Sequence, residues 1–378
     1  MHPIWWWLTV PGALIWASVL FAPWAAWRTR EALDGDAGAA DDPDLDEVTV
    51  LIPARNEAAV IGRTVAAIAA QGGRPRVVLI DDQSDDGTAE QARAAAGALD
   101  LTILSGSPLP PGWAGKLWAL EQGRAQIRTR LTLLLDADIA LQPGTLSALL
   151  RHKREAGLQF VSLMAWLRME SVWEKLLLPA FVYFFKLLYP FALSNSRNRL
   201  IAAAAGGCVL VDSRVLDDIG AFASLRGALI DDCTLARRVK SRGHRIWLGL
   251  THSALSLRDG QDFAAIHHMV ARSAFTQLRY STLLLLAVTA IFAFAFWLPL
   301  AAVLAAPRPV ALTGAATLAM LMLCYVPTLI YYRLSPRWAL AMPLIATIYL
   351  GMTWSSALRY WRGVRSAWKG RIYQTQQS

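Results

Sequence analysis

The sequence predicts an α/β domain, in which helices cover both faces of a mostly parallel sheet, with transmembrane helices at both ends of the chain. Two observations support this prediction. Between residues 48 and 280, short apolar runs alternate with segments of helical spacing, as in parallel sheets with helical crossovers. Outside these residues lie long uncharged runs, and the 378-residue chain is 55% hydrophobic with 16 tryptophans, which is unusually apolar for a soluble enzyme.

The chain begins with an apolar run of about 24 uncharged residues, enough to cross a bilayer. We expect residues 1–27 to form an N-terminal transmembrane helix. A cleaved signal peptide is the alternative, but no basic segment precedes the run. Arg28 and Arg30 follow it, so the positive-inside rule places the next residues in the cytoplasm. Residues 28–47 are acidic and rich in small residues, and we expect a flexible linker there.

The domain at residues 48–280 begins with four expected strands and three expected helices, assigned from apolar runs and from apolar spacing. The strands are residues 48–54, 76–82, 101–106 and 131–138, and the helices are residues 57–71, 87–97 and 115–127. Ligands bind beyond the carboxyl ends of the strands in such sheets. The residues at these ends are Pro53, Arg55, Asn56, Glu57, Asp81, Asp82, Asp136 and Asp138. We expect them to converge on one site.

Asp136 and Asp138 are two residues apart, so on a strand they would point to the same side. Two close carboxylates repel each other unless a cation lies between them or one is protonated. Mg²⁺ and Mn²⁺ prefer oxygen ligands and leave positions open for phosphate. The pair therefore predicts a Mg²⁺ or Mn²⁺ site that holds a diphosphate. A turn with a helix cap is the alternative, because aspartate favours both.

The segments "LIPARNEA", "LIDDQSDDGT" and "LLLDADI", in this order and spacing, resemble the family 2 glycosyltransferases, an inverting group with a GT-A nucleotide-sugar fold. The resemblance covers residues 48–279. It implies a nucleotide-diphosphate-sugar donor, for which we expect a UDP-sugar. It also implies that Asp82 or Asp81 contacts the base, that residues 53–57 line the nucleotide pocket, and that the aspartates after the fourth strand bind the metal.

Lys116 and a run of small residues are further candidates. Lys116 stands early in a helix, where the helix dipole disfavours a cation, so we expect it to meet the donor phosphates. A solvated surface lysine is the alternative. Gly206 and Gly207 permit close approach of the backbone to a ligand. The resemblance implies that they and Cys208 lie beside the sugar, with a tight turn in the core as the alternative.

Asp231 and Asp232 open an amphipathic helix in "RGALIDDCTLARRVKSRGHRIWLGL". This pair resembles the acidic pair of the family, usually Glu-Asp, whose second member is the catalytic base. The resemblance therefore assigns that role to Asp232. The chemistry needs a carboxylate that takes the proton of the acceptor hydroxyl as this hydroxyl attacks the anomeric carbon. A helix cap is the alternative.

Membrane members of the family often carry a Gln/Arg-x-x-Arg-Trp motif about 35 residues beyond the acidic pair. The segment "HHMVARSAFTQLRYS" matches it in part at residues 277–280. The resemblance implies that Arg272 or Arg279 meets the donor diphosphate. An arginine that flanks a membrane span is the alternative.

The segment at residues 172–193 is apolar and aromatic, but Lys175 and Lys186 leave too short an uncharged run to cross a bilayer. Pro179 and Pro190 are expected to break a helix. We expect this segment to lie in the headgroup layer and to present a lipid to the site. An internal helix packed on the sheet is the alternative.

The phrases "GWAGKLWAL", "LRMESVWEKLLLPAF", "AAAAGGCVLV" and "RGALIDDCTLA" are similar to the hopene-associated glycosyltransferases, a bacterial membrane branch of family 2. This similarity implies a lipid acceptor, either a hopanoid or another polyisoprenoid. It also implies a multi-pass protein of the bacterial inner membrane, with the catalytic domain facing the cytoplasm. A polyprenyl-phosphate acceptor is an alternative, and so is a non-catalytic membrane scaffold that kept the fold.

Residues 281–358 contain three apolar runs, for which we expect about three transmembrane helices. The tail at residues 359–378 is basic and aromatic within a chain of net charge +9. Beside a membrane span this favours anionic lipid over nucleic acid, so no nucleic-acid partner is expected. Three crossings would put the tail outside, against the positive-inside rule. Either residues 338–358 do not cross fully, or there is a further crossing.

Overall fold

The structure is a computed structural model that describes residues 4–38, 42–258, 260, 262–364, 367–368 and 371–372. It divides into two units. The sheet unit comprises Glu31–Arg168, Leu193–Asp259 and Arg365–Ser378, and the helical unit comprises Met1–Arg30, Met169–Ala192 and Gly260–Val364. Most of the expected basic tail lies outside the described residues. Beyond residue 364 these are the short strands β9 (Ala367–Trp368) and β10 (Arg371–Ile372).

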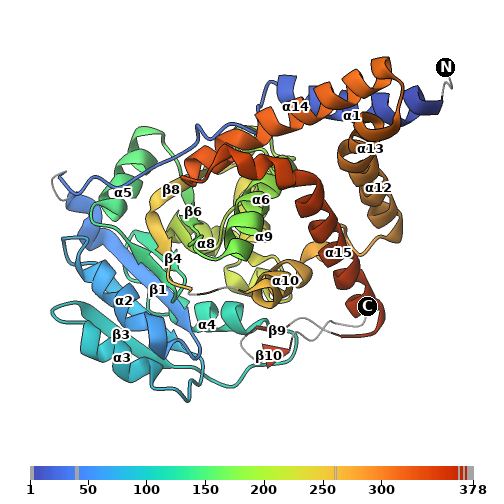
Figure 1. Cartoon of the computed structure of the whole chain (residues 1–378). Helices are drawn as coiled ribbons and strands as arrows, with labels where there is room; N and C mark the ends of the chain where they lie inside the picture. The colour runs from blue at the N-terminus through green and yellow to red at the C-terminus, as the bar shows by residue number, and fades with distance from the viewer. Residues whose placement is uncertain are drawn as a thin grey trace. The chain divides into compact units, whose positions relative to one another are not determined.

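An eight-stranded mixed sheet forms the centre of the sheet unit (Figure 1). Its strands are β1 (Val48–Ala54), β2 (Arg76–Asp81), β3 (Asp100–Ser105), β4 (Leu131–Leu135), β5 (Ile139–Leu141), β6 (Phe160–Trp166), β7 (Cys208–Asp212) and β8 (Ile246–Ser256). Their order is β3-β2-β1-β4-β7-β6-β8-β5. The predicted α/β fold is confirmed. The first four strands pair in parallel, whereas β7 is antiparallel to both β4 and β6.

Helices cover both faces of this sheet. Alternate side chains of the fully buried strand β1 point to opposite faces: Ile52 belongs to the core that includes Val65, and Leu51 to the core that includes Leu120. The first core is closed by α2 (Ala58–Ala69), α3 (Thr88–Ala95) and α5 (Thr145–Glu155). The second is closed by α4 (Gly115–Arg124), α8 (Ser213–Asp218), the 3₁₀ turn Phe222–Leu225 and α9 (Asp231–Ser241).

Strands β1, β2 and β4 end at the same edge of the sheet, as expected for parallel neighbours. The fourth strand is shorter than the expected residues 131–138, because it stops at Leu135 and a tight turn follows. In this turn the N–H of Ile139 donates to the carbonyl of Asp136 at 3.1 Å. Asp136 and Asp138 therefore lie in a turn between β4 and β5, and the alternation of a strand does not govern their directions.

The acidic segment at residues 28–47, expected to be a flexible linker, makes specific contacts at its described residues. A single bridge joins Ala32 to Leu250 of β8, and Asp34 accepts a hydrogen bond of 3.0 Å from the hydroxyl of Thr251. The 3₁₀ helix Pro43–Glu47 follows, and the carboxylate of Asp42 before it pairs with Arg154 at 2.9 Å. Acidic side chains of this segment are thus partners of the sheet unit, which corrects the expectation.

The helical unit contains α1 (Ile4–Phe21), α6 (Val172–Leu188), α10 (Phe263–Ala271), α11 (Ala274–Gln277), α12 (Thr282–Phe292), α13 (Leu298–Ala305), α14 (Arg308–Tyr331) and α15 (Met342–Trp361). A π turn, Ala293–Trp297, joins α12 to α13, and a 3₁₀ turn, Pro336–Ala341, precedes α15. Within the described residues, four helical segments are long and apolar enough to cross a membrane: Ile4–Phe21, Thr282–Ala305, Arg308–Tyr331 and Pro336–Trp361. They suggest a membrane protein.

Helix α6 is continuous through Pro179, which corrects the expected break. A capping box at Ser171 starts the helix, and the helix ends before Pro190. The hydroxyl of Tyr349 in α15 donates to the carbonyl of Leu177 at 2.8 Å, and the rings of Tyr183 and Tyr325 lie 5.1 Å apart. Packing against other apolar helices therefore holds this segment, and its place in the headgroup layer stays a prediction.

Candidate active site

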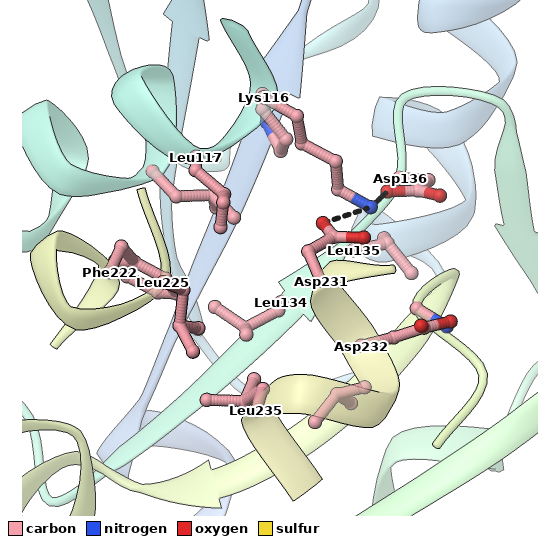
Figure 2. Close-up of a pocket in the computed structure, with 14 residues that line it drawn as sticks. Lys116, Leu117, Leu134, Leu135, Asp136, Phe222, Leu225, Asp231, Asp232 and Leu235 are labelled. Atoms are coloured by element: carbon pink, nitrogen blue, oxygen red, sulfur yellow. Dashed lines mark hydrogen bonds and ion pairs between the residues drawn. The ribbon is translucent and has the colours of Figure 1, made fainter. Parts of the chain in front are cut away.

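A pocket at the carboxyl edge of β1 and β4 contains several of the predicted site residues. Figure 2 shows acidic side chains and Lys116 toward one end, and apolar side chains from α4, α9 and the turn Phe222–Leu225 toward the other. The lining residues are Pro53, Lys116, Leu117, Leu120, Leu134, Leu135, Asp136, Gly206, Val209, Phe222, Leu225, Asp231, Asp232 and Leu235. The pocket therefore has a charged end and an apolar wall.

Lys116 connects two of the acidic segments. It stands in the first turn of α4, and Figure 2 shows its ammonium pointing toward Asp136 and Asp231. Its Nζ lies 2.6 Å from Oδ1 of Asp136 and 3.9 Å from Oδ2 of Asp231. Burial alone would lower the pKa of Lys116, but these carboxylates outweigh burial and raise it above its ordinary value. The lysine stays charged, and acidic side chains surround it.

At Asp136, burial and the neighbouring carboxylates together outweigh the effect of Lys116 on the pKa. Burial raises the pKa of its carboxyl, Asp138 and Asp231 raise it further, and Lys116 opposes this rise without cancelling it. The backbone N–H of Asp136 donates to the carbonyl of Gly207 at 3.0 Å, which fixes the residue beside the start of β7. The pocket thus concentrates more negative charge than its own lysine neutralises, as a cation-binding site requires.

Asp232 is held by two backbone donors at the start of α9. Its Oδ2 accepts from the N–H of Gly206 at 3.0 Å, and its Oδ1 accepts from the N–H of Cys233 at 2.7 Å. Burial, followed by the charge of Asp231, raises the pKa of Asp232 to about 6. A carboxylate with a pKa near neutrality can take a proton efficiently at physiological pH. Its position and basicity suit a general base.

The small residues just before β7 and at its first position lie in different places. A Cβ atom on Gly206 would lie 3.2 Å from the Cβ of Asp232 and 3.5 Å from Nζ of Lys116, so the glycine leaves room at the charged end. Cys208 is fully buried in the sheet core, where burial and the charge of Asp136 raise its thiol pKa to about 12. The structure therefore places Gly206 at the pocket and Cys208 in the core, contrary to the expectation for Cys208.

The loops beyond β1 and β2 form a second polar group at the same edge. Arg55 donates to the carbonyl of Asp82, and its Nη1 lies 4.0 Å from Oδ2 of that fully buried aspartate. Asp81 accepts from the N–H of Ser84 at 2.9 Å, and Asn56 accepts from the N–H of Asp85 at 3.1 Å. Pro53, which lies in β1 just before these loops, lines the pocket, and its described lining residues include no residue of the loops themselves.

Asp138 has a partner that no sequence motif indicated. Nε of Arg258 donates to Oδ2 of Asp138, and the backbone N–H of Leu257 donates to the carbonyl of Asp138 at 2.7 Å. The antiparallel pairing of β5 with β8, in which Ile139 faces Ser256, brings these distant segments together. Arg258 belongs to no recognisable motif, so only the strand pairing could reveal it.

Arg272 and Arg279 belong to the helical unit. Arg272 is the residue that caps the end of α10, and Arg279 follows α11 with a positive φ of 52°. The pocket of the sheet unit does not include them. Contact of either arginine with a donor diphosphate therefore stays a prediction.

The residues present fit a partial metal site. Within the described part of the chain, no three His, Cys, Asp or Glu side chains gather closely enough to hold an ion by themselves. Mg²⁺ is commonly bound by one or two carboxylates, with water and substrate phosphates as the other ligands. Asp136 and Asp138 could supply such carboxylates, and the surplus of acidic groups favours a cation. A diphosphate would have to complete the site.

Comparisons with known proteins agree with this architecture. Residues 43–273 match the family model described as glycosyltransferase like family 2. A 4,4'-diaponeurosporenoate glycosyltransferase of Staphylococcus haemolyticus is 30% identical over 95 residues, which are 25% of this chain and 24% of that protein. An undecaprenyl-phosphate 4-deoxy-4-formamido-L-arabinose transferase of Shewanella sediminis is 33% identical over 116 residues, 30% of this chain and 34% of that protein. The matches thus span about a quarter and a third of these relatives.

A solved structure shares the fold over most of the chain. The mannosyltransferase PcManGT from Pyrobaculum calidifontis, in complex with GDP-Man and Mn²⁺, superposes with a TM-score of 0.53. The match covers 92% of this chain and 97% of that one, at 19% identity. This likeness supports a GT-A-type fold for the mixed sheet and its helices.

Proposed function

The chain belongs to glycosyltransferase family 2, and we propose that it moves a sugar from a nucleotide-diphosphate donor to a lipid acceptor, with inversion at the anomeric carbon. One observation carries this proposal: Lys116, Asp136, Asp231 and Asp232 come from three separate segments and line one pocket. A chance cluster of surface charges would have no reason to surround a partly buried cation with acidic groups.

Asp232 is the proposed general base. It takes the proton from the acceptor hydroxyl while the hydroxyl oxygen attacks the anomeric carbon, and the bond to the nucleotide diphosphate breaks on the opposite side. The hydrogen bond from Gly206 holds the carboxylate in place during this step. Lys116 keeps Asp136 and Asp231 close together by balancing part of their charge. Asp136 and Asp138 would hold a divalent ion, Mg²⁺ or Mn²⁺, which would stabilise the charge of the leaving diphosphate.

The donor is proposed to bind along the edge formed by the ends of β1, β2 and β4. Pro53, Arg55, Asn56 and Glu57 would line the nucleotide, and Asp81 or Asp82 would contact the base. We assign a UDP-sugar as donor. The mannosyltransferase with the same fold was solved with GDP-Man, so competition between UDP and GDP for the purified protein tests this choice. Arg272 or Arg279 is proposed to contact the diphosphate.

The acceptor is proposed to be a lipid. Support comes from the four apolar helices long enough to cross a membrane, and from the acceptor names of the two curated relatives. Phrases such as "LRMESVWEKLLLPAF" favour a hopanoid or another polyisoprenoid. The match to the undecaprenyl-phosphate transferase favours a second candidate, a polyprenyl phosphate. That acceptor is already an anion, so sugar transfer to it would depend little on Asp232.

We place the protein in the bacterial inner membrane, with the sheet unit in the cytoplasm. Arg28 and Arg30, immediately after the first apolar segment, support this orientation. Reporter fusions at Arg30 and at Ser378 would test it. A cytoplasmic signal at Arg30 supports the orientation, and a periplasmic signal there contradicts it.

A lipid comparison tests the function directly. Membrane lipids from a strain without this protein, from its parent, and from strains that carry the wild type or Asp232→Asn on a plasmid are compared by mass spectrometry. The proposal predicts a glycosylated lipid that disappears in the deletion and returns only with the wild type. The proposal would be contradicted if the parent strain, grown under conditions in which it expresses the protein, had the same lipid profile as the deletion strain.

A further inference from the structure

The guanidinium of Arg258 lies against the carboxylate of Asp138, where a bound metal ion would also have to lie. We propose that it is a charge that the chain itself supplies to Asp138 in the absence of ligands, and that metal and nucleotide must arrive together to displace it. This inference rests on the proposed function, because it concerns the same donor site. It predicts that the protein binds a divalent ion weakly by itself and tightly with a nucleoside diphosphate.

The backbone positions Arg258 without any help from its side chain. Strand β8 ends at Ser256, which faces Ile139 of β5, and the N–H of Leu257 donates to the carbonyl of Asp138. These contacts hold the backbone immediately before Arg258 against the turn that carries Asp138. The side chain then needs only to extend for its Nε to donate to the carboxylate. Its presence at this carboxylate therefore follows from the sheet pairing.

The two aspartates of the turn each have their own basic partner. Asp136 pairs with Lys116, and Asp138 pairs with Arg258. Arg258 also lies in the electrostatic field of Asp136 and Glu57. Oδ2 of Asp138, one of the two oxygens that a divalent ion could use there, thus already has a guanidinium as its partner. A metal ion must compete with this guanidinium, in addition to losing part of its own hydration shell.

Burial decides which partner can move. The side chain of Asp138 is 8% exposed, whereas that of Arg258 is 54% exposed. The aspartate cannot turn toward water, and leaving it buried without a cation would be costly. The arginine can leave toward solvent once another cation takes its place. The exchange therefore favours simultaneous arrival of the metal and departure of the guanidinium.

A diphosphate provides a new partner for the displaced arginine. A guanidinium binds phosphate oxygens through two parallel N–H···O hydrogen bonds, a geometry that a lysine cannot reproduce. With the nucleotide present, Arg258 exchanges one anionic partner for another, and the metal gains both Asp138 and phosphate oxygens. With the metal alone, the arginine has no such replacement. Metal and nucleotide should consequently raise each other's affinity by the same factor.

The test measures binding of Mn²⁺, without any turnover. Purified full-length protein is titrated with Mn²⁺, and free Mn²⁺ is followed by electron paramagnetic resonance, with and without UDP. We expect Arg258→Gln to bind Mn²⁺ alone about tenfold more tightly than the wild type, and to lose most of the gain that UDP produces. Arg258→Lys keeps the positive charge and should remain close to the wild type for Mn²⁺ alone. Arg245→Gln, at an exposed arginine before the same strand, is the matched control and should change neither value.

The outcomes separate this inference from the proposed function. If the wild type binds Mn²⁺ with UDP, and Arg258→Gln has wild-type affinity for Mn²⁺ alone, the arginine does not compete for Asp138 and the inference is wrong. If neither protein binds Mn²⁺ in the presence of any nucleoside diphosphate, the proposed donor site fails, and the inference with it. Circular dichroism checks that each variant is folded. Arg258→Met removes the charge but keeps a similar aliphatic stem, so it should reproduce the effect of Arg258→Gln.

Discussion

Oδ2 of Asp232 accepts a hydrogen bond of 3.0 Å from the backbone N–H of Gly206. This contact joins the first turn of α9 to the segment that enters β7, and both residues line the pocket that contains Lys116. The carboxylate at the centre of the proposed chemistry is thus fixed by the backbone, so side chains around it can be changed while its position is kept.

Asp232→Asn should abolish transfer to a hydroxyl acceptor. The amide keeps the size of the carboxylate but cannot take a proton, and loss of a general base costs a factor of about 10²–10⁴ in rate. Labelled sugar in the lipid fraction, measured with purified protein in lipid nanodiscs, reports this loss. Asp100→Asn, at an exposed residue of β3, is the control and should keep full activity. Wild-type turnover of Asp232→Asn would remove the assigned role and favour an anionic acceptor.

The pH dependence of the wild type should show an acidic limb near pH 6. Asp232 has its pKa raised to about 6, by burial and then by Asp231. Its carboxylate predominates above this pH, and protonation below it removes the base. We therefore expect kcat/KM to fall by about tenfold per unit as the pH drops below 6. A rate that stays constant from pH 7.5 to pH 4.5 would contradict the assignment.

Lys116→Met should move this acidic limb to higher pH. The charge of Lys116 opposes the effects of burial and Asp231, and so lowers the pKa of Asp232. Without the ammonium, the pKa of the carboxyl rises, and the base is protonated at a higher pH. A purely structural role of Lys116 would lower the rate at every pH without moving the limb. Lys153→Met removes a lysine that pairs with Asp212 at 2.7 Å, outside the pocket, and should leave the limb in place.

Gly206→Ala should reduce activity more than stability. The added methyl group would lie 3.2 Å from the Cβ of Asp232 and 3.4 Å from its Oδ2, so the carboxylate must shift by a few tenths of an ångström. A misplacement of about 1 Å in a catalytic group can lower the rate about 10²-fold, and for this smaller shift we expect a loss of about tenfold. In Gly62→Ala on α2, the new methyl has its nearest contact at 3.7 Å. This control should retain activity and gain up to about 1 kcal/mol.

Lys240→Met should destabilise the sheet unit. Lys240 is 4% exposed, and its Nζ donates to the carbonyls of Leu193 and Ile201 at 3.2 and 2.7 Å, and to that of Ser194. Methionine fills the space but cannot donate a hydrogen bond, so the carbonyls of Ser194 and Ile201 lose the donor that the lysine supplies, at a cost of about 1–3 kcal/mol. Thermal unfolding followed by circular dichroism measures this loss. Arg238→Met, on the exposed side of the same helix, should leave the transition within a degree or two, and an equal loss in both variants would contradict the argument.

The fold was predictable because its first half follows local rules. Apolar runs and helical spacing specified β1 to β4 and α2 to α4, and parallel pairing brought their carboxyl ends to one edge. The prediction failed at Asp136 and Asp138, because these residues lie in a turn that leads into β5, a short strand that the sequence did not reveal. Strand β7 was equally hidden, since its antiparallel pairing with β4 depends on residues far along the chain.

Site residues that belong to sequence motifs could be predicted. Site residues that are brought together only by strand pairing could not. Asp231 and Asp232 could be assigned from their position at a helix start and from family resemblance. Arg258 could not, because its partner lies 120 residues away and only the pairing of β5 with β8 joins them. Pro179 was misjudged for a related reason, since packing within the helical unit keeps α6 continuous despite the missing N–H.

Calorimetric titration of UDP into the purified full-length protein, with and without Mn²⁺, shows whether the acidic pocket binds a sugar-nucleotide donor through a metal ion. We expect heat of binding that depends on the metal, is lost in Asp138→Asn, and persists in Asp232→Asn, because the base is not needed to bind the donor. The absence of metal-dependent binding for every nucleoside diphosphate would mean that the acidic pocket is not a donor site, and that the protein is a scaffold that kept the fold.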